Sequence, residues 1–494
     1  MSSETIIAVI DSRIWLPPGL PKSFIRELKG KFRHNNPDFF RARNQGRRTW
    51  GIPSKIETFA MLEDPEFGFR PTLPRGGTNQ LRTVCDAFGF NLRWIDRRLS
   101  VPTKFEHFQI DPDHPEYELR YYQEEAVEAA LKIQQGICRA PTGSGKTIAA
   151  LNFLYRANER ALIVMRDSNL LKQWLKVVQT VLGLKRNQIG IIQGSKPYKP
   201  GRSIVLALQQ SLVSKNGRAL KALIKNDPVG ALVIDEAQTV AAKTFLEVVD
   251  NVPCKYRIGF SADETRRDNK EFLIYDEMGP VIHEVTKKEL ETEGVIHKVK
   301  VRVIPTRFKA DWYRNAQGYE KNFPRLIDEI VEDVERNRFI VWNIQRIIAL
   351  KEVPLIAFTH RVDHATYLAT EELNLNGIPC GLFLGGTQNS VRFEVDLLQL
   401  SRGELKVGVG TYQAIGQGHD IPIIRAGLCL TPISKSNPQF FNQVCGRICR
   451  TTKGKKGATL YYLWDSEVFP DHLRVLKSWS SNNLEVFYDG KWVS

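Results

Sequence analysis

The stretch GICRAPTGSGKTIAALNFLYRA, residues 136–157, decides the fold. A short apolar run opens it, a glycine-containing turn follows, and a helical pattern completes it. Glycines between a strand and a helix let backbone N–H groups turn inward around phosphate oxygens, and the helix N-terminus adds a partial positive charge. The stretch therefore predicts a phosphate-binding loop over residues 140–147.

Each polar residue of this loop has an expected role. Lys146 is expected to bridge the β- and γ-phosphates, and the Thr147 hydroxyl to bind Mg²⁺. The other predicted phosphate-loop residues are Pro141, Thr142, Gly143, Ser144 and Gly145. Upstream, Arg120 and Gln123 precede an amphipathic helical pattern. A glutamine amide can pair with both N6 and N7 of adenine, which predicts ATP as the nucleotide, although glutamine is also an ordinary residue at a helix start.

A pair of carboxylates follows the apolar run ALVI at residues 231–234. In a parallel sheet the carboxyl end of a strand is where ligands bind, so these acids can meet the phosphates. Asp235 is predicted to hold Mg²⁺, and Glu236 to orient and deprotonate the attacking water. Seen alone, such a pair is also typical of a solvated turn.

Apolar, β-rich runs alternate with helical patterns from about residue 136, and the alternation restarts after about residue 350. This rhythm predicts an α/β fold with two tandem parallel-sheet lobes. The first ~105 residues are richer in Pro, Gly, Arg and aromatic residues, which predicts a small α+β accessory domain. The expected domains are 1–105, a probable DNA-binding domain; 106–297, the first, nucleotide-binding lobe; and 298–494, the second lobe.

The composition restricts the class of protein. The 42% hydrophobic and 25% charged residues are typical of a globular chain. A formal charge of +15 attracts polyanions such as DNA or RNA, although basic proteins without such a partner are common. The seven cysteines form no CxxC pair and are expected to be reduced and mostly buried. Neither a secretion signal nor an apolar stretch of ~20 residues is evident, so we expect a cytoplasmic protein without a membrane partner.

Near the C-terminus, two arginines are spaced three residues apart in QVCGRICR, residues 443–450. This spacing places Arg447 and Arg450 on one face of a predicted helix, and Gln443 shares that face. Guanidinium groups reaching the γ-phosphate from the second lobe would stabilise charge that develops during hydrolysis. The alternative is a surface helix with ordinary salt bridges.

Together these runs resemble the ordered motif set of superfamily 2 helicases over roughly residues 115–465. The resemblance implies RecA-like lobes, ATP and Mg²⁺ as cofactors, and nucleic acid as partner. Further matching segments are VMRDSNLLKQW at 164–174, ALQQSL at 207–212, GFSADETRRD at 259–268, AFTHRVDHA at 357–365 and VGVGTYQAIGQGHDIP at 407–422. In the last of these, Gly418 and Asp420 match a nucleotide-contacting pattern. Asp263 departs from the family's usual threonine and lacks its hydroxyl donor.

The connector from Gly279 resembles that of the Rad25/XPB and RecG-like DNA branch and of a phage recombination helicase. This resemblance implies a monomeric motor that migrates branched DNA and remodels forks, largely independently of sequence, in a host cytoplasm if the source is a phage. An RNA helicase is the alternative enzyme, because the motor motifs serve either polymer. A nucleotide-gated binding protein without turnover is the alternative of a different class.

Contacts to the nucleic acid backbone are expected at Gln173, Ser211, Arg361 and Thr411, although these residues could equally cap strand ends. In the N-terminal region, basic residues alternate with aromatic ones. The basic residues of interest are Arg41, Arg43, Arg47 and Arg48, and the aromatic ones are Phe32, Phe39, Phe40 and Trp50. Such a surface suits phosphates and exposed bases, but the aromatics could instead form the core of a small domain.

Overall fold

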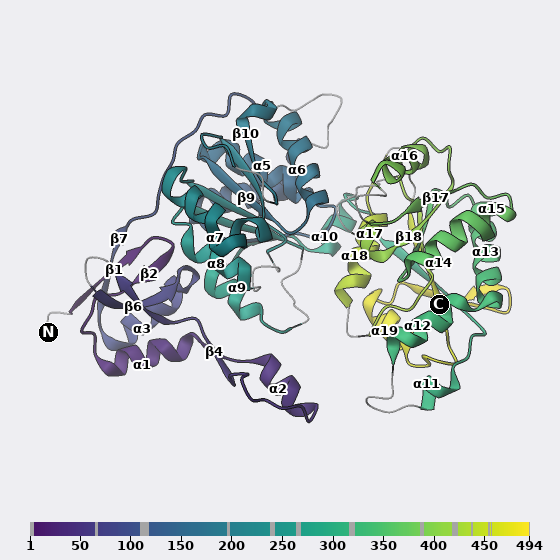
Figure 1. The fold of residues 1–494 in the computed structure, drawn as a ribbon, viewed down its shortest axis with the longest axis horizontal. Helices are drawn as coiled ribbons and strands as arrows, with labels where there is room; N and C mark the ends of the chain where they lie inside the picture. Colours follow the sequence, from purple (N-terminus) through teal and green to yellow (C-terminus); the bar gives the residue numbers. More distant parts are fainter. Residues whose placement is uncertain are drawn as a thin grey trace. The chain divides into compact units, whose positions relative to one another are not determined.

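The computed structural model describes residues 4–493 except 65–67, 109–117, 195–197, 238–242, 263–267, 316–321, 386–389, 417–422, 436–437, 453–454 and 456. The chain forms two compact units (Figure 1). The first comprises Met1–Pro141 and Gly145–Thr286, and the second Lys287–Ser494 with Thr142–Ser144. Among the described residues, no helix is both long and apolar enough to cross a membrane. The seven cysteines are free thiols, and all except Cys380 are buried.

The first unit begins with a five-stranded sheet in the order β5-β6-β2-β1-β7. Phe24, Leu28 and Leu81 are buried members of its core, from helices α1 and α3. Beyond the sheet, β3 and β4 pair separately and enclose α2 in sequence. The elements are β1 (Thr5–Ile10), β2 (Arg13–Trp15), α1 (Lys22–Lys31), β3 (Arg33–Asn35), α2 (Pro37–Asn44), β4 (Lys55–Glu57), β5 (Ala60–Asp64), β6 (Gly68–Pro74), η1 (Arg75–Gly77), α3 (Thr78–Phe88) and β7 (Asn91–Asp96).

This N-terminal sheet is fixed to the following lobe by a fully buried arginine. Arg75 donates hydrogen bonds to the carbonyl oxygens of Cys254 at 2.5 Å and Lys255 at 2.7 Å, and to Oε1 of Gln135 at 2.6 Å. Burial lowers the pKa of Arg75 to about 9. At the adjacent Gly76, a Cβ atom would lie 2.3 Å from the carbonyl oxygen of Tyr275, so only glycine permits this approach.

The lobe that follows contains a seven-stranded sheet in the order β10-β11-β9-β12-β13-β8-β14, in which every pair is parallel. Its elements are α4 (Tyr121–Ile133), β8 (Gln135–Arg139), α5 (Lys146–Ala157), β9 (Ala161–Met165), α6 (Ser168–Val181), η3 (Arg186–Gln188), β10 (Ile189–Ile192), β11 (Ile204–Leu208), α7 (Gln209–Asn226), β12 (Ala231–Asp235), α8 (Lys243–Asn251), β13 (Tyr256–Ser261), α9 (Glu271–Met278) and β14 (Val281–Glu284).

The apolar strands of this lobe are buried because both faces of the sheet are covered. Alternate residues of a strand point to opposite faces, so Val233 and Ile234 of β12 belong to different cores. The core of Val233 includes residues from α4, α5 and α6, and that of Ile234 includes residues from α7, α8 and α9. This double burial explains why the strands read as continuous apolar runs.

The second unit contains an eight-stranded sheet in the order β17-β18-β16-β19-β20-β15-β21-β22, parallel except for the last pair. Its elements are α10 (Lys287–Thr292), β15 (Val299–Pro305), α11 (Asp311–Asn315), α12 (Phe323–Glu332), α13 (Val334–Ala349), β16 (Leu355–Thr359), α14 (Val362–Tyr367), η6 (Leu368–Glu372), α15 (Leu373–Leu375), β17 (Cys380–Phe383), α16 (Ser390–Ser401), β18 (Val407–Thr411), α17 (Tyr412–Gly416), β19 (Ala426–Cys429), α18 (Pro438–Ile448), β20 (Ala458–Trp464), α19 (His472–Trp479), β21 (Leu484–Tyr488) and β22 (Lys491–Val493).

The predicted fold class is confirmed: two α/β parallel-sheet lobes follow one another, and a smaller N-terminal part precedes them. The N-terminal sheet ends at Asp96, and the sheet of the first lobe begins at Gln135. The domain limits at 105/106 and 297/298 stay predictions.

Candidate nucleotide site

Three neighbouring strands of the first lobe end at the candidate site. The order β12-β13-β8 places the end of β12, at Asp235, beside the end of β13, at Ser261, and the end of β8, at Arg139. The predicted phosphate loop follows β8, and the Ala140 N–H donates to the carbonyl oxygen of Ser261 over 2.9 Å. Since carboxyl ends of parallel strands share one sheet edge, the loop and the acids lie at the same edge.

Between β8 and α5 the chain forms a turn that depends on glycine. Gly143 and Gly145 have φ angles of +90° and +80°, in the left-handed region that side chains disfavour. A Cβ atom on Gly145 would also lie 2.3 Å from Nε2 of Gln123. Lys146 is the first residue of α5, and its Nζ donates to the carbonyl oxygens of Ala140 at 3.0 Å and Pro141 at 3.4 Å. The Lys146 side chain therefore contacts the backbone of the same loop in which it is predicted to bind phosphate.

Gln123 supports this loop from α4. Its Oε1 accepts a hydrogen bond from the Arg120 N–H at 2.8 Å, and its Nε2 donates to the carbonyl oxygen of Gly145 at 3.2 Å. Arg120 is the N-cap residue of α4. Adenine recognition by Gln123 stays a prediction.

Asp235 is buried, and its carboxylate is held by a tryptophan. The indole N–H of Trp174, on α6, donates to Oδ2 of Asp235 over 2.7 Å. Burial and the neighbouring charge of Glu236 raise the pKa of Asp235 to about 6, whereas Trp174 and Lys146 lower it. Glu236 itself has φ +58°, a conformation that costs about 1–3 kcal/mol in a non-glycine residue and clusters at functional sites.

These side chains fit a magnesium–nucleotide. A buried carboxylate whose pKa is raised by desolvation gains from a nearby cation, which Mg²⁺ would supply. Within the described parts of the chain, no group of three or more His, Cys, Asp or Glu side chains could hold a metal by itself. A nucleotide-bound Mg²⁺ takes only one or two protein ligands besides phosphates and water. The two predicted metal ligands, Thr147 in the first turn of α5 and Asp235, match this number of protein ligands.

In the second unit, the structure separates the two arginines that the sequence placed on one helix. Gln443 and Arg447 lie on α18, which ends at Ile448. Arg450 lies beyond the helix, where it pairs with Ile296 in an antiparallel bridge. The prediction that Arg450 shares a helix face with Arg447 was therefore wrong. The helix ends before Arg450, whose backbone pairs instead with that of Ile296. Burial lowers the pKa of Arg450 to about 10, which leaves it charged at neutral pH.

Several residues predicted to contact nucleic acid have local structural partners. The Ser211 hydroxyl accepts from the Gly194 N–H at 2.8 Å, and the Thr411 hydroxyl accepts from the Ala414 N–H at 3.2 Å. Arg361 donates to Asp328 at 2.6 Å. Gln173 is half-buried on α6. Ser211 and Thr411 thus accept hydrogen bonds from the backbone near strand ends, as the alternative role of capping strand ends predicts. Their contacts with nucleic acid stay predictions.

Some predicted residues lie outside the described residues. They are Gly418, Asp420, Asp263 and Arg266.

Some of the N-terminal aromatic residues are buried in the core of the domain, and others lie on its surface. Phe32 is fully buried in the core of the N-terminal sheet, and Phe39 is half-buried. Phe40 is 37% exposed, and Trp50 is 96% exposed. Arg41, Arg43, Arg47 and Arg48 are exposed as well. Part of the aromatic set therefore forms the core, and part remains on the surface among arginines.

Sequence reasoning missed Trp174 as a residue of the site and singled out its neighbour Gln173. It also gave no role to Asp167. Asp167 is the N-cap of α6, and its carboxylate accepts from the N–H groups of Asn169 and Leu170 at 3.0 Å each. An aspartate before a helical pattern is a recognised start signal that could have found this cap.

Comparison with known proteins places these features among helicases. Residues 116–278 match the family model described as type III restriction enzyme, res subunit. The XPB subunit of the TFIIH complex of Trypanosoma brucei brucei is 27% identical over 198 residues, which is 37% of this chain and 21% of that protein. The DNA 3'-5' helicase XPB of Mycobacterium tuberculosis is 25% identical over 210 residues, 42% of this chain and 38% of that protein. Both matches span well under two thirds of the relatives' lengths.

Two solved structures align with this chain at low identity, and the one with a TM-score above 0.5 has the same fold. S. cerevisiae Dbp5 bound to RNA and ADP BeF3 aligns with a TM-score of 0.53 and 14% identity over 78% of this chain and 95% of that chain. T4 UvsW aligns over 98% of this chain and 99% of that chain at 16% identity, with a TM-score of 0.42.

The loop, the acids and the glutamine occur in the helicase order on a confirmed pair of parallel-sheet lobes. The family match covers the lobe that carries them, and the XPB homologues match at the level of sequence. On these grounds the chain resembles superfamily 2 helicases and translocases, among them the XPB homologues.

Proposed function

We propose that this chain is an ATP-dependent DNA helicase or translocase that acts on branched DNA in recombination, repair or replication. The observation that carries the proposal is the position of Lys146, Asp235 and Glu236 at one edge of the first lobe's sheet, where Lys146 and Glu236 both shift the pKa of Asp235. Bound ATP with Mg²⁺ would supply the phosphoryl group whose hydrolysis drives movement. Lys146 would bind and neutralise phosphate oxygens, Asp235 and Thr147 would hold the metal, and Glu236 would take the proton of the attacking water.

The choice of DNA is supported by the mycobacterial relative, which is a DNA 3'-5' helicase. The net charge of +15 favours a polyanion and predicts binding that weakens steeply with salt. Action on branched DNA follows the resemblance of the connector from Gly279 to the Rad25/XPB and RecG-like branch. We include in the proposal that the motor acts as a monomer in a cytoplasm.

The first test compares ATP hydrolysis with double-stranded DNA, single-stranded DNA and RNA. We expect stimulation by DNA, and stimulation by RNA alone would refute the choice of polymer. Junction and fork substrates are then incubated with ATP or with a non-hydrolysable analogue. Conversion of the junctions only with ATP supports remodelling, whereas a chain that hydrolyses ATP on DNA but leaves every junction intact is not a branch-remodelling enzyme.

The second test separates turnover from binding. Glu236→Gln should lower kcat by about 100-fold or more, the range expected for loss of a general base, while ATP still binds. Glu128→Gln is the matched control, since Glu128 lies on α4 of the same lobe and pairs with Arg156 at the surface. Wild-type hydrolysis in Glu236→Gln would remove Glu236 from this role.

A further inference from the structure

A segment of the N-terminal part extends away from its sheet and carries a fully exposed tryptophan. We define the arm as residues 33–57, which comprise β3, α2, β4 and the loop between α2 and β4. Figure 1 shows α2 at the far end of this segment, beyond the sheet that contains β1 and β6. Trp50, in the loop, is 96% exposed, although tryptophan is highly buried on average. An indole this exposed is available for a contact with a partner.

The arm is strongly basic around this tryptophan. It contains six Lys and Arg residues and two acids. Both acids are already paired: Asp38 with Lys270 at 2.6 Å and with Arg41 at 3.4 Å, and Glu57 with Lys29 at 3.0 Å and with Arg33. Of the four exposed arginines of α2 and the loop, Arg41 pairs with Asp38, whereas none of the ion pairs of the described residues includes Arg43, Arg47 or Arg48. Their positive charge therefore faces solvent beside an exposed indole.

The loop that contains Trp50 forms hydrogen bonds with α2 and with its N-cap residue, Asn36. Asn36 is buried, its Nδ2 donates to the carbonyl oxygen of Pro53 at 2.7 Å, and its N–H donates to that of Ser54 at 3.0 Å. The Arg47 N–H donates to the carbonyl oxygen of Ala42 at 2.9 Å. These bonds hold the loop in one conformation, which lowers the entropy cost of a contact made by Trp50.

The base of the arm is fastened to α9 of the nucleotide-binding lobe. The His34 ring stacks on that of Phe272, with centroids 4.1 Å apart. Asp276 contacts His34 Nε2 at 2.8 Å and accepts from the Thr58 hydroxyl at 2.6 Å. Since α9 is the next helix after β13, which ends at Ser261 in the site, the arm is attached to the lobe that holds the phosphate loop.

We propose that the arm binds DNA at the point where its strands separate, with Trp50 stacked on an unpaired base and the nearby arginines on phosphates. Every base has a face on which an indole can stack, so the contact is independent of sequence. A protein partner would be expected to meet a contiguous apolar patch, whereas here a single indole lies among arginines. The proposal rests on nucleic acid as the partner, which belongs to the proposed function.

The test uses the full chain without nucleotide and measures its affinity for a labelled forked DNA by fluorescence anisotropy. Trp50→Ala should weaken fork binding by roughly 5- to 100-fold, the effect of losing one stacked base. Its affinity for closed circular duplex DNA, which offers no unpaired base, should not change. Trp50→Phe should restore most of the fork affinity. Phe69→Ala, which removes another exposed aromatic of the same domain, should have no effect.

A 2-aminopurine at the branch point reports stacking directly. Its fluorescence should be quenched by the wild-type chain and by Trp50→Phe, but not by Trp50→Ala. Wild-type fork affinity in Trp50→Ala, an equal loss on fork and circle, or a loss confined to an RNA fork would each overturn the proposal. Because no nucleotide is present, a chain that fails to hydrolyse ATP on DNA would refute the proposed function and leave these results unaffected.

Discussion

The indole N–H of Trp174 donates a hydrogen bond to Oδ2 of Asp235 over 2.7 Å, and both side chains are buried. The bond joins α6 to the end of β12 and lowers the pKa of a carboxylate that burial and Glu236 raise. Trp174 therefore orients Asp235 and favours its charged form. It acts as a positioning residue for the predicted metal ligand.

Trp174→Phe should keep the packing of α6 and lose this hydrogen bond. Partners that orient metal ligands typically contribute 10- to 100-fold to metal affinity or activity, so we expect ATP hydrolysis to fall by about that factor. The Mg²⁺ concentration for half-maximal hydrolysis should rise, and DNA affinity without nucleotide should stay at the wild-type level. The measurement is an ATPase titration with Mg²⁺.

Trp312→Phe is the matched control, because the Trp312 indole also donates to a carboxylate, Oε2 of Glu329, at 2.7 Å in the second unit. It should leave the Mg²⁺ dependence unchanged. If Trp174→Phe lowers hydrolysis without altering that dependence, Trp174 contributes packing alone and the positioning role fails.

The sequence predicted the local backbone wherever a pattern has one structural meaning. The glycine turn lies between a strand and a helix as expected, and the continuous apolar run ending in Asp235 places the acid at the edge of a parallel sheet. The phosphate-binding role of the turn stays a prediction. The link between Trp174 and Asp235 was not predictable, because it depends on packing between residues 61 positions apart. Periodicity predicts which face of a helix is buried, but not which polar atom of that face finds a partner.

The N-terminal region was predicted less completely. Its composition mixes arginines and aromatics, and no spacing separates the buried Phe32 from the exposed Trp50. Docking of this region was also missed, since Arg75 reaches carbonyl oxygens 179 and 180 residues away. At the C-terminal side, helical spacing extended α18 to Arg450, whereas pairing with Ile296 ends the regular helix earlier.

Gln123→Ala should raise the KM for ATP, because the Gly145 carbonyl loses the Nε2 donor that supports the phosphate loop. If the amide also contacts adenine, as the sequence predicts, the preference for ATP over GTP should fall at the same time. Steady-state hydrolysis of both nucleotides by wild type and variant measures the two effects separately.

Gln188→Ala is the matched control for this variant. Gln188 makes the same kind of contact, with its Oε1 accepting from the Lys185 N–H at 2.8 Å, in η3 of the same lobe. It should have wild-type kinetics. An equal rise of KM for ATP and GTP in Gln123→Ala would limit Gln123 to loop support, and an unchanged KM would contradict both roles.

Asp465→Ala should destabilise the second unit strongly. Asp465 accepts hydrogen bonds from Nε of Arg336 at 2.8 Å and from the Thr306 hydroxyl at 2.6 Å, and the arginine and the aspartate are almost fully buried. Removing one partner leaves an uncompensated buried charge, which costs about 3–5 kcal/mol. Hydrogen exchange of β20 amides in increasing urea measures this loss.

The exposed pair of Arg314 and Glu467, 3.5 Å apart, provides the control for that variant. Glu467→Ala should cost less than about 1 kcal/mol, since solvent screens the pair. Similar losses in the two variants would show that burial does not govern the contribution of Asp465.

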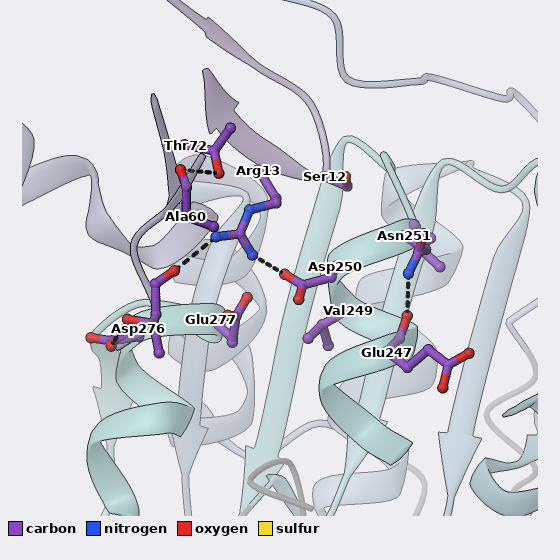
Figure 2. A network of polar contacts seen from close by, with 12 residues as sticks. Ser12, Arg13, Ala60, Thr72, Glu247, Val249, Asp250, Asn251, Asp276 and Glu277 are labelled. Atoms are coloured by element: carbon purple, nitrogen blue, oxygen red, sulfur yellow. Dashed lines mark hydrogen bonds and ion pairs between the residues drawn. The ribbon is translucent and has the colours of Figure 1, made fainter. Parts of the chain in front are cut away.

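Glu277 lies buried where the N-terminal sheet meets α9 (Figure 2). Its Oε2 has no hydrogen-bond partner among the described residues. Arg13 donates nearby to Asp250 at 2.6 Å and to the Thr58 carbonyl oxygen at 2.8 Å. Burial and then Asp250 raise the pKa of Glu277, Arg13 and Arg257 lower it, and Asp276 raises it, which together give a pKa of about 8.

A carboxyl whose pKa is higher in the folded chain than in the unfolded chain stabilises the fold while it is protonated, and this stabilisation is lost as pH rises towards the folded pKa. For Glu277 the loss should extend from the ordinary value of 4.5 to about 8. Glu277→Gln stays neutral at every pH. The free energy of opening of the N-terminal sheet, measured by hydrogen exchange, should therefore fall less with rising pH in the variant than in wild type. The difference between the two slopes should be at most about 1.4 kcal/mol per pH unit. Glu284→Gln, at an exposed site on β14, should follow wild type. Parallel pH curves for wild type and Glu277→Gln would show that Glu277 does not take up a proton on folding.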